Sequence, residues 1–376
     1  MEKLGKYIQE YTVKNKCAED IPVYSVTNTQ GFCKDYFGKE VASKDKTTYK
    51  IVPKGYFAYN PSRINVGSVD WQRNKERVIV SPLYNVFSVS EQLHQQYLYY
   101  YLKSDIVRQF IKVIARGTVR DNLKLSMLCE FPIYVPSVLE QENIVVKLDG
   151  LQKVIKLRKH QLQKLDELIQ ARFVEMFGDP VVNDKGWKID TVEKLCKEIY
   201  GGGTPSKSHP EYYEDGNIPW VSSKDMKTDV LNDSQIKINQ LGVDNSTARM
   251  VPVNSVIMVI RSGILKHTLP VAINVVPITV NQDLKVFIPN ERLLTRFLAV
   301  QFKMHEKDIL SGVRAVTADN IEFNSLKQRK LIVPPIELQQ EFADFAHQVN
   351  KSKVEIQQAL EKTQLLFDSL MQQYFG

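Results

Sequence analysis

Cysteine is scarce in this chain of 376 residues. No two cysteines have the two-residue spacing of a zinc knuckle, and they are too few for the disulfide framework of a small secreted protein. The sequence therefore favours a reduced, intracellular setting for all of them, namely Cys17, Cys33, Cys129 and Cys196.

Long apolar runs are absent as well. The N-terminal residues 1–5 begin no apolar signal segment. No stretch reaches the roughly 18 consecutive apolar residues that span a bilayer. We therefore expect a cytoplasmic protein without a membrane partner.

The excess of positive charge is small. The formal net charge is +7, which permits an anionic partner such as DNA but does not require one. Hydrophobic residues make up 43% and charged residues 25%, the range of an ordinary globular protein. The length is sufficient for two or three domains with sizeable cores.

An internal repeat organises the chain. A constant offset of 198 residues carries residues 136–144 (PSVLEQENI) onto residues 334–342 (PPIELQQEF). The same offset carries Phe177-Gly178 onto Phe375-Gly376 and residues 121–123 onto 319–321. Upstream the match is looser, which is expected if two copies keep a scaffold and recognise different partners. Divergence by drift would give the same pattern.

Each repeat ends in a run of about 40 residues that favours a long helix. The runs contain no proline, and apolar residues recur at steps of seven with polar interruptions. In the first run the two sets of positions are Leu148, Ile155, Leu162, Ile169 and Met176, and Ile144, Leu151, Arg158, Leu165 and Arg172. In the second run they are Ala346, Lys353, Leu360, Phe367 and Tyr374, and Phe342, Val349, Ile356, Thr363 and Leu370.

The connectivity predicts how these helices pair. The first helix would leave one globular part and enter the next, whereas the second would leave that part and end the sequence. An antiparallel coiled coil with a pseudo-two-fold repeat is the simplest arrangement. The alternative is two amphipathic helices that pack separately, each on its own domain.

The first part of each repeat mixes short β-rich runs, such as residues 251–260, with turn clusters, such as residues 201–205. We therefore predict an α/β fold with two mixed α/β domains joined by two long antiparallel helices. The predicted boundaries are 1–135 for the first domain, 136–178 for the first helix, 179–333 for the second domain and 334–376 for the second helix.

Catalytic motifs are weak. Residues 201–203 are three glycines, but they lack the ending of a phosphate-binding loop, so a turn is the better interpretation. Residues 60–63 (NPSR) share only their first two residues with the base-flipping loop of amino-methyltransferases. The six histidines show no metal-ligand spacing. We therefore predict no catalytic, cofactor or metal site on this chain.

Candidate DNA-binding residues occur on corresponding loops of the two halves. DNA binding requires Lys and Arg for phosphates, and forked or amide side chains for base edges. For any one of these residues a solvated surface side chain is the simpler interpretation, but as a set they favour DNA contact. The candidates are Asn60, Arg63, Arg116, Thr118 and Arg120 in the first half, and Lys224, Arg261, Lys266, His267, Asn281, Gln282 and Arg314 in the second.

These segments resemble the specificity subunits of type I restriction-modification systems. The resemblance covers essentially the whole chain and rests on residues 334–342, their partner 136–144, the two Phe-Gly ends, and the order of residues 201–206 (GGGTPS), 218–222 (IPWVS) and 224–226 (KDM). One departure is that residues 179–187 introduce the second half, whereas no such lead-in precedes the first.

The resemblance implies a division of labour. Each globular domain would be a target-recognition domain for one half of a bipartite site in double-stranded DNA, and the helices would fix the gap. Two methyltransferase subunits would use S-adenosylmethionine, and restriction subunits would use ATP and Mg²⁺. A coiled-coil scaffold that binds only proteins is the alternative. A fused enzyme that methylates DNA by itself would need a cofactor-binding region that this sequence does not show.

Overall fold

The computed structural model describes residues 1–34, 45–114, 122–315 and 319–376, without the side chains of Arg314 and Ala315. The chain forms two compact units. Unit 1 consists of Met1–His160 with Gln357–Gly376, and unit 2 consists of Gln161–Ile356. The candidates Arg116, Thr118 and Arg120 lie outside the described residues.

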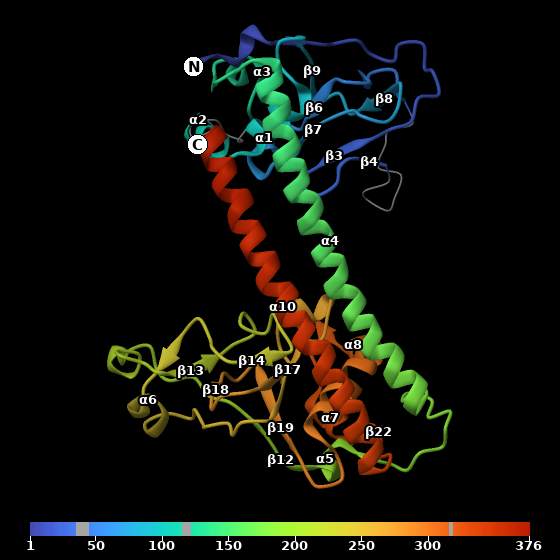
Figure 1. The fold of residues 1–376 in the computed structure, drawn as a ribbon, viewed down its shortest axis with the longest axis vertical. Helices are drawn as coiled ribbons and strands as arrows, with labels where there is room; N and C mark the ends of the chain where they lie inside the picture. The colour runs from blue at the N-terminus through green and yellow to red at the C-terminus, as the bar shows by residue number, and fades with distance from the viewer. Residues whose placement is uncertain (35–44, 115–121, 316–318) are drawn as a thin grey trace. The chain divides into compact units, whose positions relative to one another are not determined.

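Two helices of 40 residues occupy the predicted heptad runs, α4 (Val138–Phe177) and α10 (Ile336–Phe375). Both pass through both units, so each unit contains one part of each helix. The beginning of α4 and the end of α10 belong to unit 1, and the end of α4 and the beginning of α10 belong to unit 2. The two helices therefore run antiparallel where they pack within a unit, as Figure 1 shows for unit 1.

Unit 1 is built around a four-stranded antiparallel sheet with strand order β2-β9-β6-β7. Three two-stranded sheets, β1-β10, β3-β4 and β5-β8, surround it. The strands are β1 (Glu2–Lys3), β2 (Ile8–Glu10), β3 (Ser25–Thr27), β4 (Gly31–Cys33), β5 (Lys50–Pro53), β6 (Phe57–Tyr59), β7 (Val69–Trp71), β8 (Arg77–Val80), β9 (Asn85–Val89) and β10 (Pro132–Ile133). The short helices are η1 (Leu4–Lys6), η2 (Ile64–Val66), α1 (Gln95–Lys103), α2 (Asp105–Ile114) and α3 (Leu125–Leu128).

Unit 2 contains a five-stranded sheet with order β12-β19-β16-β17-β14, whose edge pair β14-β17 is parallel, and a three-stranded sheet with order β15-β13-β18. The strands are β11 (Ile189–Thr191), β12 (Cys196–Gly201), β13 (Ile218–Val221), β14 (Val230–Leu231), β15 (Lys237–Ile238), β16 (Val256–Val259), β17 (Val271–Asn274), β18 (Thr279–Val280), β19 (Leu284–Pro289), β20 (Arg314–Ala315), β21 (Asp319–Asn320) and β22 (Lys330–Ile332). The short helices are η3 (Pro210–Tyr212), η4 (Gly263–Lys266), α5 (Val192–Leu195), α6 (Gln240–Asp244), α7 (Thr295–Met304), α8 (Glu306–Ser311) and α9 (Phe323–Gln328).

The main sheets of the two units share a scaffold. The order β2-β9-β6-β7 in unit 1 matches the order β12-β19-β16-β17 in unit 2. In both units the second strand of this order leads into a helix: α1 follows β9, and α7 follows β19. The predicted mixed α/β class is confirmed, and the shared motifs at residues 136–144 and 334–342 lie at the beginnings of α4 and α10.

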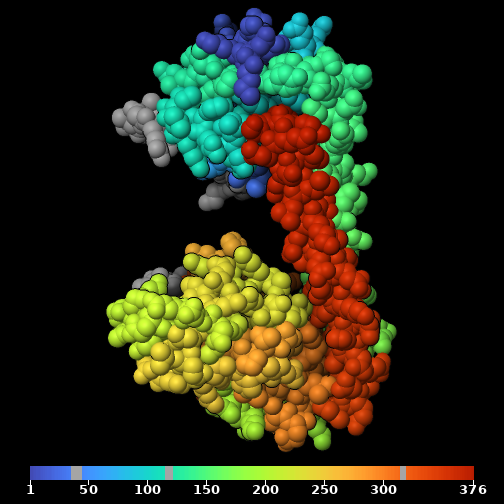
Figure 2. Space-filling view, turned by 60° about the vertical axis from the view of Figure 1, so that its left-hand side comes forward, coloured from blue at the N-terminus to red at the C-terminus, as the bar shows by residue number. Residues whose placement is uncertain are grey.

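Aromatic residues anchor the helix ends. In unit 1 the ring of Phe375, near the end of α10, lies 5.0 Å from the ring of Tyr97 on α1. Figure 2 shows the last turns of α10, in red, against the teal surface of this unit. In unit 2 the buried ring of Phe177, at the end of α4, lies 4.9 Å from that of Phe297 on α7 and 5.8 Å from that of Phe342 on α10. Burial of such rings is the main stabilising contribution at these junctions.

The polar interruptions of the heptad pattern have partners. Arg158 donates to the carbonyl oxygen of Ala359 and to the hydroxyl of Thr363, both on α10. The ammonium of Lys353 lies 2.7 Å from a carboxylate oxygen of Asp166 and 3.3 Å from one of Asp229. Burial alone would lower the pKa of Lys353, but these two carboxylates more than offset that effect, so the pKa is raised.

A backbone turn ends α4. Gly178 has a φ of +75°, a left-handed conformation that glycine adopts without strain. The following segment then covers the last carbonyl groups, because Lys185 donates to Glu175 and the indole of Trp187 donates to Phe177 at 2.8 Å. The lead-in at residues 179–187 therefore caps the first long helix. Within the described residues, no helix has the length and apolar character needed to cross a membrane.

Candidate nucleic-acid interface

Arg261 follows strand β16 and lies on the surface of unit 2. Its Nε and Nη2 atoms lie 2.7 Å and 2.6 Å from the same carboxylate oxygen of Asp283, in the turn before β19. A backbone bridge between Arg261 and Asn320 brings β21 alongside. The guanidinium is about half exposed, so its fork is oriented by a carboxylate and remains open to an external partner.

Lys266 ends the short helix η4, next to the same strand. Its ammonium lies 3.7 Å from a carboxylate oxygen of Asp319, which is buried and belongs to β21. The backbone N–H of Ser262 donates to the carbonyl oxygen of Asp319, so the turn that carries Lys266 is fixed to β21. His267 follows directly and is exposed.

Asn281 and Gln282 form the turn between β18 and β19, but they differ in exposure. Asn281 is buried, and its amide donates to Asp283 at 3.2 Å, so it shapes the turn that presents Asp283 to Arg261. Gln282 is exposed and accepts a hydrogen bond from the hydroxyl of Thr204, in the loop after the three glycines. A DNA contact by either residue stays a prediction.

The remaining candidates of the second half lie around this group. The backbone of Arg314, on β20, pairs with Asn320 of β21, the strand whose Asp319 lies near the ammonium of Lys266. Lys224 is exposed in the turn from Ser222 to Asp225. This turn begins beside Asn281, whose N–H donates to the carbonyl oxygen of Val221. We call the set of Arg261, Lys266, His267, Gln282 and Arg314 the β16–β21 cluster.

In unit 1 the structure describes two of the five candidates. The side chain of Asn60 accepts hydrogen bonds from the N–H and the hydroxyl of Ser62, at 3.1 Å and 2.9 Å, so it stabilises the turn after β6. Arg63 is exposed, and its carbonyl oxygen closes the same turn by accepting from Ser68. The loop therefore presents the guanidinium of Arg63 at the end of β6, the strand that corresponds to β16 in the shared order.

Two further cations on the elements around β12 and β19 were not among the candidates from the sequence. Lys285 is half-buried on β19, opposite Gly201, and its ammonium lies 4.7 Å from the ring centre of Phe323. Burial lowers its pKa. The guanidinium of Arg249 lies 4.0 Å from the ring centre of Tyr200 and 2.6 Å from a carboxylate oxygen of Glu198. Both positions depend on the β12–β19 register and on loop packing, which no local sequence signal reports.

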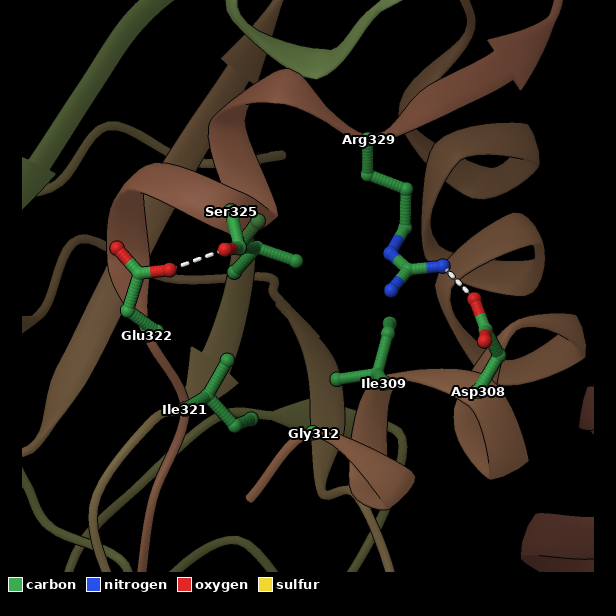
Figure 3. A pocket seen from close by; sticks show the side chains of 8 residues that line it. Asp308, Ile309, Gly312, Ile321, Glu322, Ser325 and Arg329 are labelled. Carbon is green, nitrogen blue, oxygen red and sulfur yellow. Dashed lines mark hydrogen bonds and ion pairs between the residues drawn. The ribbon is translucent and has the colours of Figure 1, made fainter. Parts of the chain in front are cut away.

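A small cavity also lies in unit 2, between α8, β21 and α9 (Figure 3). Its volume is about 190 Å³, which is below the size of usual sites for nucleotide-sized ligands. Its lining residues make two interactions with one another, one from Arg329 to Asp308 and one from Ser325 to Glu322. No group of three or more His, Cys, Asp or Glu side chains suited to a metal ion occurs among the described residues.

Comparison with known families decides the identity of the repeat. The family model of the type I restriction modification DNA specificity domain matches the chain twice, at residues 3–167 and 184–365. The chain belongs to this family. The resemblance inferred from the sequence motifs is therefore confirmed.

Specificity subunits are also among the similar curated proteins. The type I restriction enzyme EcoR124I/EcoR124II specificity subunit of Escherichia coli is 37% identical over 147 residues, which are 39% of this chain and 36% of that subunit. The MjaIX specificity subunit of Methanocaldococcus jannaschii is 24% identical over 311 residues, which are 78% of this chain and 70% of that subunit. The chain thus spans about a third of the first relative's length and about two thirds of the second.

Solved structures share the fold. The crystal structure of a type I restriction-modification S subunit from M. genitalium covers 100% of this chain and 95% of its own, with a TM-score of 0.58 and 12% identity. A chain from a study of complex assembly and conformational transition of the type I system covers 99% and 96%, with a TM-score of 0.53 and 16% identity. At these identities the likeness concerns the fold alone.

Proposed function

We propose that this chain is the DNA sequence-specificity subunit of a type I restriction-modification complex and reads a bipartite site. The observation that carries the proposal is the double match of the specificity-domain family, one match to each repeat. The shared order of the two main sheets supports it, because two copies of one scaffold suit two half-sites. A scaffold that binds only proteins would leave the family relationship unexplained.

In unit 2 we assign DNA reading to the β16–β21 cluster. A guanidinium fork donates to the two acceptor atoms of guanine in the major groove, and amide side chains pair with adenine. Arg261, oriented by Asp283, and Gln282 have the right chemistry for bases. Lys224, Lys266 and His267 suit phosphates. In unit 1, Arg63 on the turn shaped by Asn60 takes the corresponding role.

The long helices would set the distance between the half-sites. Each has 40 residues and is about 60 Å long at about 1.5 Å per residue. We propose that they form an antiparallel coiled coil and that a pseudo-two-fold axis relates the halves. The seven-residue steps, and the partners of Arg158 and Lys353 across the helix pair, support this arrangement.

The chemistry would belong to partner subunits in the cytoplasm. We propose that two methyltransferase subunits supply S-adenosylmethionine chemistry and that restriction subunits use ATP and Mg²⁺. The chain itself would bind and orient the duplex without a catalytic, cofactor or metal site. The similar curated proteins, which are specificity subunits of type I restriction enzymes, support this division.

Reconstitution tests the proposal. The purified chain should transfer no methyl group to DNA, and the methyltransferase partner without it should show no sequence preference. Together, with S-adenosylmethionine, they should methylate plasmid DNA at one split sequence. Methylation by the purified chain alone, or the same methylated sequence without the chain, would contradict the proposal.

A further inference from the structure

The middle of α4 is basic and contains no acidic residue. Between Asp149 and Asp166 the sequence has five lysines and arginines and no carboxylate. Two of the cations have protein partners, because Arg158 bonds α10 and Lys164 pairs with Glu167 at 2.7 Å. The others are exposed and form no ion pair within the described residues, namely Lys153, Lys156 and Lys159.

This arrangement differs from the usual surface of a solvated helix. Elsewhere on α4 and α10, several charged and amide side chains pair along the helix, as Arg172 does with Glu175 and Gln357 with Glu361. Lys153, Lys156 and Lys159 have no such partner in the part of the chain that the structure describes, so no carboxylate there offsets their mutual repulsion. An anionic partner outside the chain would provide the compensation.

Helical geometry places two of these lysines on the face of α4 that meets the recognition domain of unit 1. That face is defined by Asp149, which accepts from Gln96 at 3.0 Å, and by the buried residues Val145 and Gln141. Lys156 comes seven residues after Asp149, and Lys159 comes eighteen after Gln141. At 3.6 residues per turn these separations are close to two and to five whole turns, so both lysines continue the same face beyond the domain.

We propose that Lys156 and Lys159, with Lys153 beside them, bind phosphates of the DNA gap between the two half-sites. This inference rests on the proposed function. We take the duplex that both domains read to run along the helix that connects them, and its gap carries the same dense negative charge as its half-sites. Lysine suits this task, because an ammonium binds phosphate as a point charge without reading the base.

The decisive variant is K156Q/K159Q, which removes two charges and keeps good helix formers. The matched control is K147Q. Lys147 is also exposed on α4 and forms no ion pair within the described residues, but it precedes Lys156 by nine residues, which is two and a half turns, and so lies on the opposite side. Thermal unfolding of both variants is expected to match the parent, because all three positions are exposed.

Binding is measured with the full chain assembled with its methyltransferase partner, on a duplex that carries the mapped site. The slope of log affinity against log salt should fall by about one for each lysine removed. The ratio of affinities for the correct site and for a site with one altered half should stay the same. K147Q should keep the parental slope, and an equal slope in K156Q/K159Q would overturn the proposal.

DNA with uncharged linkages in the gap tests whether the lysines bind there. Methylphosphonate linkages in the gap should weaken binding by the parent and remove the difference between parent and K156Q/K159Q. A difference that persists on the neutral gap would overturn the assignment. The assignment would also be overturned if K156Q/K159Q kept the parental salt slope but assembled more weakly with the methyltransferase partner in sedimentation, since the lysines would then bind a protein. If the parent methylates no split site, the proposed function fails, and that result is separate from the behaviour of the lysine variants.

Discussion

Gln141 and Gln339 make the same three hydrogen bonds in the two halves of the chain. The amide of Gln141 donates to the carbonyl oxygens of Gln92 and Pro136, and its oxygen accepts from His94, at 2.8–2.9 Å. The amide of Gln339 donates to Arg292 and Pro334, and its oxygen accepts from Leu294, all at 2.9 Å. Both side chains are fully buried. Each therefore fixes the first turn of a long helix to the loop before α1 or α7.

Replacing Gln339 by Met should destabilise unit 2. The change keeps the size of the side chain but removes the partner of the buried carbonyl group of Pro334 and of the part-buried groups of Arg292 and Leu294, so we expect a loss on the order of 3 kcal/mol. Equilibrium unfolding in urea measures it. Gln340 is the matched control, because its side chain donates only to Asp344 on the same helix, in an exposed hydrogen bond, so Gln340→Met should change stability by less than about 0.5 kcal/mol. Equal effects at the two positions would contradict the assigned role.

Substitutions at Arg261 and Arg63 should separate the two half-sites. Arg261→Ala should relax the preference of the half-site read by unit 2, and Arg63→Ala that of the other, by about 1–3 kcal/mol for a lost bidentate contact. Competition between duplexes with one altered half-site measures both effects. Arg292 serves as a control, because it is exposed and pairs with Asp190 away from the β16–β21 cluster. A uniform loss on both half-sites would show that the arginines bind phosphates or support the fold.

Shortening both helices together should shorten the recognised gap. Deletion of residues 157–163 and 355–361 removes one heptad from each helix and keeps the seven-residue apolar pattern in phase. The two deleted segments face each other, because Arg158 donates to the carbonyl oxygen of Ala359. The pair becomes shorter by roughly 10 Å, or about three base pairs. Methylation mapping should give the same half-sequences with a smaller gap. An active variant with an unchanged gap would refute the role of the helices, and deletion in one helix alone should prevent assembly.

The pH dependence of stability should report on His305. This residue is buried, and neither ring nitrogen has a partner within the described residues. Burial, with a further contribution from Arg329, lowers its pKa from 6.5 to about 4. As the pH falls from 6.5 toward 4, the unfolded chain therefore binds a proton that the folded chain excludes, and stability falls by at most roughly 3 kcal/mol.

His305→Leu should flatten that dependence. Urea unfolding of the parent and the variant between pH 7.5 and pH 4 measures the difference. His347, exposed on α10, provides the control, and His347→Gln should keep the parental dependence. If the parent and His305→Leu lose stability equally, His305 is already protonated in the folded chain or other groups dominate.

The parts that could be predicted from the sequence are those with a local signal. The heptad steps predicted α4 and α10, and the offset of 198 residues predicted two copies of one scaffold. The seven-residue pattern of the second helix also included Lys353 as a polar interruption. Its partner Asp229 could not be predicted, because that residue lies more than a hundred positions away and reaches Lys353 only through the packing of unit 2 on α10.

In the candidate site too, only the residues with a local sequence signal could be predicted. Arg261 and Lys266 were found because they follow a strongly apolar strand, where the chain turns at the surface. The carboxylates that orient them, Asp283 and Asp319, were not found, because they come from a neighbouring turn and from β21. Lys285 was missed because its position under Gly201 depends on the β12–β19 register. Pairing between strands is not encoded in the residues of one strand alone.

Methylation mapping of genomic DNA from cells that carry this chain and its methyltransferase partner tests the central claim most directly. We predict one methylated motif, made of two short sequences separated by a gap of fixed length. Arg261→Ala should degrade one of these sequences and Arg63→Ala the other. A continuous motif, or a motif that is unchanged in cells without this chain, would contradict the claim that its two halves read the two parts of a split site.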